Sequence, residues 1–169
     1  MSGAQKVLII GGLILAAFGM LDGLHFALFV EHQTLEGMGA SLNRAFVAAA
    51  EQQPAARGAA LASYARTKYV YVRQVDVHSH WIGLAMLLIV LGAAFESVIF
   101  TNRTRLWIAF ALLIGAAVFP LGVWLQTVIS GPLPSALAIF GSALVTTALA
   151  FAIIGFSRTG SGKVDHSKS

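Results

Sequence analysis

Long apolar runs along the chain alternate with short polar connections. Four such runs, each of about 20 residues or more, occupy 7–30, 80–100, 106–129 and 134–156. At about 1.5 Å per residue, a helix of that length crosses about 30 Å of hydrocarbon. The pattern therefore predicts an all-α integral membrane protein, with four transmembrane helices packed in a bundle and forming one domain over 1–157.

The segment between the first two runs, 31–79, is too polar to span a membrane. It is rich in alanine and has few helix breakers beyond Pro54 and Gly58. This composition predicts a helical extramembrane loop with two helices, at 39–52 and 56–76. Because nothing between Gly58 and the second run breaks a helix, we expect the second of these helices to continue into the second transmembrane helix as one long rod.

Composition agrees with this pattern. Of the 169 residues, 57% are hydrophobic and 11% are charged, and the mean hydropathy is +0.80, so the chain cannot cover itself with polar groups in water.

The absence of cysteine excludes disulfides, thiolate metal sites and cysteine nucleophiles. The net charge of +4 comes from basic residues that flank the apolar runs, which indicates a lipid bilayer as partner and no nucleic acid. The Gly-, Ser- and Lys-rich tail 158–169 is expected to be disordered.

The short connections predict the orientation. The connection 101–105 reads Thr-Asn-Arg-Thr-Arg, whereas 130–134 reads Ser-Gly-Pro-Leu-Pro and carries no charge. Short loops with excess Lys and Arg stay in the cytoplasm. We therefore expect a multi-pass protein of the inner or plasma membrane with both termini cytoplasmic and 31–79 outside. Because four helices enclose little volume, a homo-oligomer is expected.

Ionisable side chains inside membrane helices are costly, and they are the first candidates for function. In or beside the first two runs they include Asp22, His25, His32, His78 and His80. Steps of 100° per residue place Asp22, His25 and His32 on one helical stripe, which we expect to face protein. For Asp22 and His25, a hydrogen bond to each other or to backbone is the alternative interpretation.

The four histidines are expected to converge, because the first helix ends and the second begins at the same end of the bundle. Neutral imidazole binds haem iron, copper, zinc or nickel. The candidate metal ligands are His25, His32, His78 and His80. Haem b needs only one or two histidines and a slot lined by glycine, for which Gly83, Gly115 and Gly122 are the candidates. Close helix packing is the alternative role of these glycines.

Several residues of the second helix and of the following hairpin carry a family resemblance: His78 with Ser79, Met86, Phe100 and the sequence Thr-Asn-Arg-Thr-Arg-Leu at 101–106. Over about 78–125 the chain resembles styrene oxide isomerase and, more distantly, small membrane isomerases of the hydroxylaminobenzene mutase type. The resemblance implies a four-helix membrane protein in which His78 is the axial ligand of a ferric haem b. The other face of the haem would act as a Lewis acid on a lipophilic small molecule.

Two polar positions of that family differ here. The asparagine that follows the histidine is replaced by Leu84, and the tyrosine of the third helix falls near Trp124. The indole N–H of Trp124 and the amide of Gln126 are the candidate replacements. We therefore expect a haem-dependent isomerase. The alternatives are a cytochrome b-like electron carrier with two histidine ligands, or a non-enzymatic accessory subunit of a membrane complex.

Overall fold

The structure is a computed structural model that describes residues 1–158; of the tail predicted to be disordered, 159–169 lie outside the described residues. The regular structure of the described part is entirely helical. In chain order it consists of α1 (Gly3–His25), the π-helical turn η1 (Phe26–Val30), α2 (Glu31–Ala50), α3 (Pro54–Ala94), the 3₁₀ turn η2 (Phe95–Ser97), α4 (Asn102–Val128) and α5 (Pro132–Ser157). Four continuous helical segments are long and apolar enough to cross a membrane, as the apolar runs predict.

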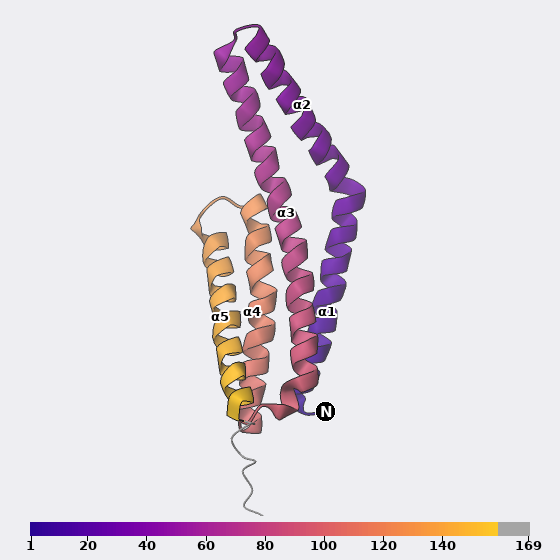
Figure 1. The fold of residues 1–169 in the computed structure, drawn as a ribbon, viewed down its shortest axis with the longest axis vertical. Helices are drawn as coiled ribbons and strands as arrows, with labels where there is room; N and C mark the ends of the chain where they lie inside the picture. Colours follow the sequence, from indigo (N-terminus) through magenta and orange to yellow (C-terminus); the bar gives the residue numbers. More distant parts are fainter. Residues whose placement is uncertain (159–169) are drawn as a thin grey trace, which may run out of the picture.

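The helices form two regions along one long axis (Figure 1). In the first region α1, the second half of α3, α4 and α5 run side by side. In the second, α2 and the first half of α3 form an antiparallel hairpin that extends well beyond the loop between α4 and α5. We call residues 31–79 of this second region the hairpin. The N-terminus lies at the opposite end of the molecule from the tip of the hairpin.

Local sequence explains where the helices begin. Ser2 caps α1: its side chain accepts a hydrogen bond from the amide of Gln5, and the Gln5 side chain accepts one from the Ser2 amide. Thr101 caps α4 in the same way with its hydroxyl. Pro54 and Pro132 stand at the first positions of α3 and α5, where a missing N–H costs nothing.

Two predicted boundaries differ from the structure and one prediction is confirmed. The first helix does not stop at 30, because no proline or capping residue interrupts it, and it continues through η1 to Ala50 as a stretch of 48 residues. The predicted rod is present: α3 runs unbroken for 41 residues, from Pro54 to Ala94. The second helical segment ends at Ser97 and not at 100, because the chain turns back after η2, where Phe95 is completely buried.

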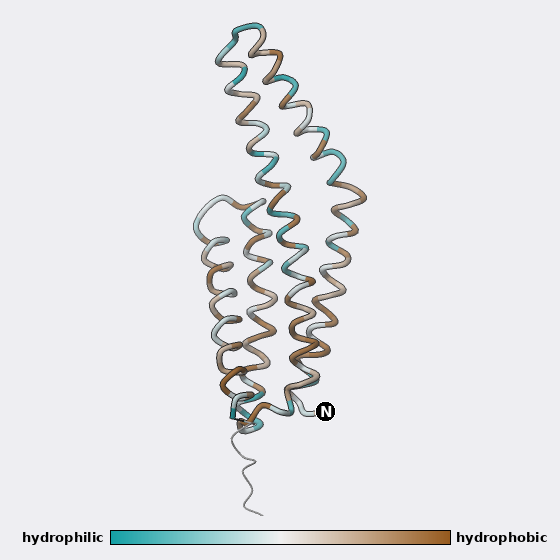
Figure 2. Tube along the Cα trace, in the orientation of Figure 1, coloured by the Kyte–Doolittle hydropathy of each residue, from teal (hydrophilic) through white to brown (hydrophobic). Residues whose placement is uncertain are grey.

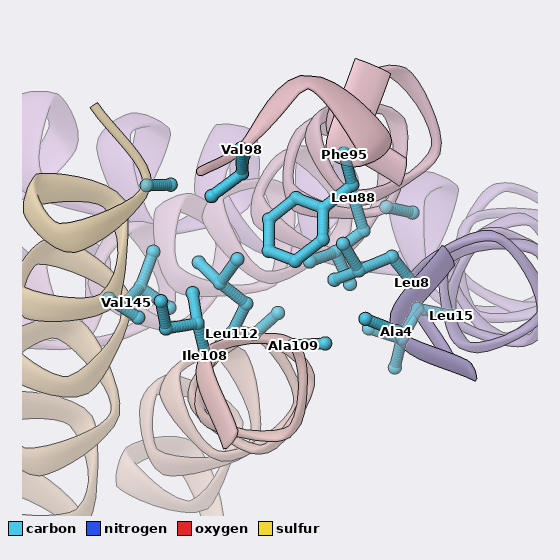
Figure 3. Packing of buried hydrophobic residues seen from close by; sticks show 14 residues of the cluster. Ala4, Leu8, Leu15, Leu88, Phe95, Val98, Ile108, Ala109, Leu112 and Val145 are labelled. Carbon is cyan, nitrogen blue, oxygen red and sulfur yellow. The ribbon is translucent and has the colours of Figure 1, made fainter. Parts of the chain in front are cut away.

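The core joins all four long segments near the N-terminal end of the molecule (Figure 3). Leu8 of α1, Leu88 of α3 and Leu112 of α4 surround Phe95, and all four side chains are at most 1% exposed. Helices α4 and α5 approach most closely at glycines: a Cβ on Gly122 would lie 2.8 Å from the Cα of the facing α5 residue, Ala138. Small residues at such contacts allow close packing of membrane helices.

The outer surface of the bundle is apolar. In the most hydrophobic part of each of the four segments, at most 44% of the residues are buried, so large aliphatic and aromatic side chains cover the outside. Hydrophilic positions recur along the hairpin instead (Figure 2). A surface of this kind is stable in hydrocarbon and unstable in water.

Candidate functional site at His78

His78 lies where the second half of α3 begins to pack against α1. Its Nδ1 atom is 2.9 Å from the carbonyl oxygen of Gly19. Because a carbonyl can only accept a hydrogen bond, Nδ1 is the donor, and Nε2 of the neutral ring carries the lone pair. Within residues 1–158, Nε2 forms no hydrogen bond. His78 therefore presents one unpaired nitrogen that can bind a metal or accept a proton.

Two glycines of α1 make this position possible. The imidazole ring lies against Gly23, where an added Cβ would be 2.5 Å from Nδ1 of His78, well inside van der Waals contact. One turn earlier, Gly19 is also buried, and a Cβ there would meet Trp81 at 2.8 Å. Any larger residue at 23 would displace the ring, so α1 is shaped to receive His78.

Asp22 adds a carboxyl group to this site. It is half-buried and interacts electrostatically with His78 and His25. No hydrogen bond or ion pair of its carboxylate is found within residues 1–158. The alternative interpretation that Asp22 and His25 simply hydrogen-bond each other is therefore not what the structure shows; the carboxylate is placed beside two imidazoles without being paired to either.

His80 has the same tautomer as His78 but faces another helix. Its Nδ1 donates to the carbonyl oxygen of Asp76, one turn earlier in α3, at 2.6 Å. Its ring stands edge-on to Phe119 of α4, with 4.7 Å between centroids. His78 is therefore directed to α1, whereas His80 is directed to α4.

The other two histidines lie on the surface. His25 is exposed, and its ring lies 5.5 Å from that of Phe29. His32 is paired with Glu36 at 3.1 Å, and its side chain is 85% exposed. The expectation that Asp22, His25 and His32 share a protein-facing stripe is therefore wrong. The π turn η1 between His25 and His32 contains extra residues per turn, which rotates the following helix away from the α-helical register.

The predicted convergence of four histidines is also not found. In the part of the chain that the structure describes, no three His, Asp or Glu side chains are arranged to hold a metal ion. The prediction assumed that the first helix ends near 30, but the continuous helix carries His32 out along the hairpin. A haem needs only one or two protein ligands, so haem binding stays a prediction.

The three glycines that were expected to line a haem slot lie in different surroundings. A Cβ on Gly115 would lie 2.9 Å from the carbonyl oxygen of Gly141 in α5, and Gly122 contacts the α5 backbone as described above. Gly83 faces open space with no atom within 4 Å. The close-packing role therefore applies to Gly115 and Gly122, and these three glycines do not line a common slot.

The two candidate replacements for the family's polar groups lie on the last turns of α4. Val123 of α4 packs against Val77 of α3, so Trp124 and Gln126 are near the level of His78 along the bundle. Trp124 is 40% exposed, and its carbonyl oxygen accepts a hydrogen bond from Thr127. Whether either side chain serves a ligand of His78 stays a prediction.

One further polar residue accompanies His78. The side-chain oxygen of Gln74 is shielded from solvent and has no hydrogen-bond donor within residues 1–158. Gln74 lies four residues before His78 and therefore on the same face of α3. The four-residue spacing from His78 is visible in the sequence, but Gln74 lies outside the apolar runs, where a polar residue is ordinary and carries no signal of function.

Comparison with known proteins adds no assignment: no family model matches the chain, and no curated protein or solved structure is significantly similar to it. The resemblance to styrene oxide isomerase therefore remains an expectation from the residues between 78 and 125.

Proposed function

We propose that this chain is an integral membrane protein that crosses the bilayer four times, with both termini in the cytoplasm and the hairpin outside. The apolar outer surface of the bundle supports insertion. The orientation is supported by Arg103 and Arg105 in the first turn of α4 and by the uncharged connection between α4 and α5. The hairpin carries most of the remaining charged residues, as expected of a segment in water.

We further propose that the protein binds haem b through Nε2 of His78. The observation that supports this ligand is the hydrogen bond from Nδ1 of His78 to the carbonyl oxygen of Gly19. Histidines that bind metals almost always donate their other ring N–H to a carbonyl or carboxylate, which fixes the tautomer and the ring orientation. The donor chemistry of His78 therefore fits an axial ligand. Gly83, Gly115 and Gly122 do not line a common slot, and we assign them no role in holding the porphyrin.

The residues around His78 have distinct tasks in this proposal. Gly23 provides the space for the ring, and Gly19 holds it in the tautomer that leaves Nε2 free. Asp22 places a carboxyl group near the ring, and its ionised form would stabilise positive charge at a metal bound to Nε2. A ferric haem held there would supply a Lewis acid for a lipophilic substrate that arrives through the bilayer.

For the reaction itself, we propose isomerisation of a lipophilic small molecule, as the family resemblance implies. Leu84 cannot hydrogen-bond, so any polar group that orients the substrate must come from elsewhere, and Gln126 or the indole of Trp124 are the candidates on α4.

The test is the visible spectrum of the protein purified from membranes in mild detergent. Iron ligated by imidazole gives a Soret band near ~400–420 nm, and His78→Ala should reduce this band to a small fraction of the wild-type absorbance. His80→Ala is the matched control, because its ring makes the same kind of Nδ1 hydrogen bond but faces α4. Wild-type protein that shows no Soret band and takes up no added hemin would refute haem binding and favour the accessory-subunit alternative.

A second candidate is electron transfer with haem bound by two histidines. The observation that favours it is the position of Asp22, which interacts with both His78 and His25. In that case the ferric protein is six-coordinate and does not bind cyanide or imidazole, whereas a single-histidine site binds both. His25→Ala would then convert the spectrum to a five-coordinate form.

A further inference from the structure

The tip of the hairpin carries a hollow and an unusually exposed aromatic residue. The hollow lies between α2 and α3 and has a volume of about 530 Å³. Half of its lining residues are small, namely Ala48, Ala56, Ala59, Ala60 and Ser63, and the other half are Asn43, Arg44, Val47, Glu51 and Gln53. Phe46 of α2 is 72% exposed, more than any other phenylalanine of the described chain, and it does not line the hollow. An apolar ring exposed in the polar part of a molecule indicates a contact with another molecule.

Both features lie at the same height along the hairpin. The hydroxyls of Ser41 in α2 and Ser63 in α3 are 3.3 Å apart, which sets the antiparallel register of the two helices. Because the two helices are antiparallel, a step of one residue towards the tip in α2 corresponds to a step to the preceding residue in α3. Counted from the Ser41–Ser63 pair, Phe46 is level with Ala59 to within about one residue, or ~1.5 Å.

The ring and the hollow face opposite edges of the hairpin. Arg44 lines the hollow, and Phe46 is two residues further on, about 200° around α2. On α3, Ala59 lines the hollow, and Arg57 lies about 200° around the helix from it. One edge of the hairpin therefore presents Phe46 and Arg57, and the other presents the alanine-lined hollow.

We propose that Phe46 of one copy inserts into the hollow of a neighbouring copy, so that hairpins join head to tail into a closed ring outside the membrane. The proposal rests on the membrane insertion proposed above. Copies inserted in the same direction are related by a rotation axis along the membrane normal. Phe46 of one copy and the hollow of the next are then at the same height and can meet. The proposal does not depend on haem.

Charge on the two edges favours a second copy as the occupant. Arg57, on the edge of Phe46, is exposed and has no ion-pair partner within residues 1–158. Glu51 lies on the wall of the hollow, about one helical turn closer to the tip, where its carboxylate accepts a hydrogen bond from the side-chain amide of Gln53 and is within reach of an arginine side chain from the neighbouring copy. Arg44, on the same wall but further from the tip, donates to the hydroxyl of Ser41 at 3.1 Å. Insertion of Phe46 would thus bring together a basic and an acidic group at the rim of the contact.

Because the chain has no cysteine, the contact can be tested by cross-linking introduced pairs in native membranes. The double variant Phe46→Cys with Ala59→Cys should give a ladder of disulfide-linked multimers on oxidation. Phe46→Cys alone should stay monomeric, because a head-to-tail contact never brings two copies of Phe46 together. The matched control is Phe46→Cys with Ala65→Cys, since Ala65 is an exposed alanine of the same helix about 10 Å away from the required height.

If the Phe46→Cys, Ala59→Cys variant gives no stronger a ladder than the Ala65 control, the proposal is overturned. Dimers of Phe46→Cys alone that are as strong as the products of the double variant would also overturn it, because they indicate a symmetric contact. As a second measurement, Ala59→Leu fills the hollow and Phe46→Ala removes the ring. Each should lower the particle mass found by native mass spectrometry from lipid particles, whereas Ala65→Leu should not. Unchanged masses, or a monomeric wild type, would count against the ring. Recovery of the chain in the soluble fraction would refute membrane insertion separately, and absence of a Soret band would refute haem alone.

Discussion

Replacing Gly23 by alanine tests the site at His78 without altering any ligand. The new Cβ would lie 2.5 Å from Nδ1 of His78, and ordinary contact requires at least 3.4 Å, so the ring must move by about 1 Å. The hydrogen bond from Nδ1 to Gly19, now 2.9 Å, would then exceed the length at which it has any strength.

The expected magnitude follows from that displacement. Loss of the hydrogen bond costs about 1 kcal/mol of stability, and the steric conflict adds about 1–3 kcal/mol. Removing the group that orients a metal-binding histidine typically lowers metal affinity by about 10- to 100-fold. Gly23→Ala should therefore fold with reduced thermal stability and bind hemin about 10- to 100-fold more weakly than wild type.

The assay is a hemin titration in mild detergent, followed by the Soret band, with thermal unfolding of the same samples. Gly58→Ala is the control, because this glycine of α3 has no atom within 4 Å of the added Cβ and lies far from His78. Its substitution should leave hemin affinity unchanged. If Gly23→Ala binds hemin with wild-type affinity and an unshifted band, then Nε2 of His78 is not the ligand that the geometry indicates.

Three other predictions follow from the same structure. A cysteine introduced at Ala62 near the tip of the hairpin should react with an impermeant maleimide in intact cells, whereas a tag on either terminus should be protected; the opposite pattern would reverse the proposed orientation. Asp22→Lys places a cationic side chain beside His78 and should lower expression and stability far more than Asp22→Leu, as detergent melting curves would show; equal behaviour would mean that position 22 does not face the protein. Gly122→Leu should separate α4 from α5 and cost about 3 kcal/mol or more, because the added side chain meets the backbone at Ala138; wild-type stability would contradict the packing described.

The sequence by itself determines the architecture to a large extent. About twenty apolar residues in succession favour a long helix, because a helix satisfies each backbone hydrogen-bonding group within the segment. The four long helical segments and the unbroken rod of α3 were predicted for that reason. The helical hairpin was also predicted, since alanine-rich sequence without breakers favours helix strongly.

Tertiary structure decides how the polar residues are grouped. Helical periodicity placed Asp22, His25 and His32 on one stripe, but the π turn η1 rotates the chain between the last two, and no local residue preference indicates that turn. The partner of His78 could not be predicted either. Its hydrogen bond goes to a backbone carbonyl of Gly19, 59 residues away, and every residue has such a carbonyl, so no residue type in the sequence distinguishes this one.

The glycines show the same limit. In the sequence, Gly23, Gly83, Gly115 and Gly122 are equivalent small residues in apolar helices. In the structure, Gly23 contacts the ring of His78, Gly83 faces open space, and Gly115 and Gly122 lie in the contact between α4 and α5. Which neighbour fills the space beside a glycine depends on helix rotation and crossing, and these are set by the packing of all four segments together.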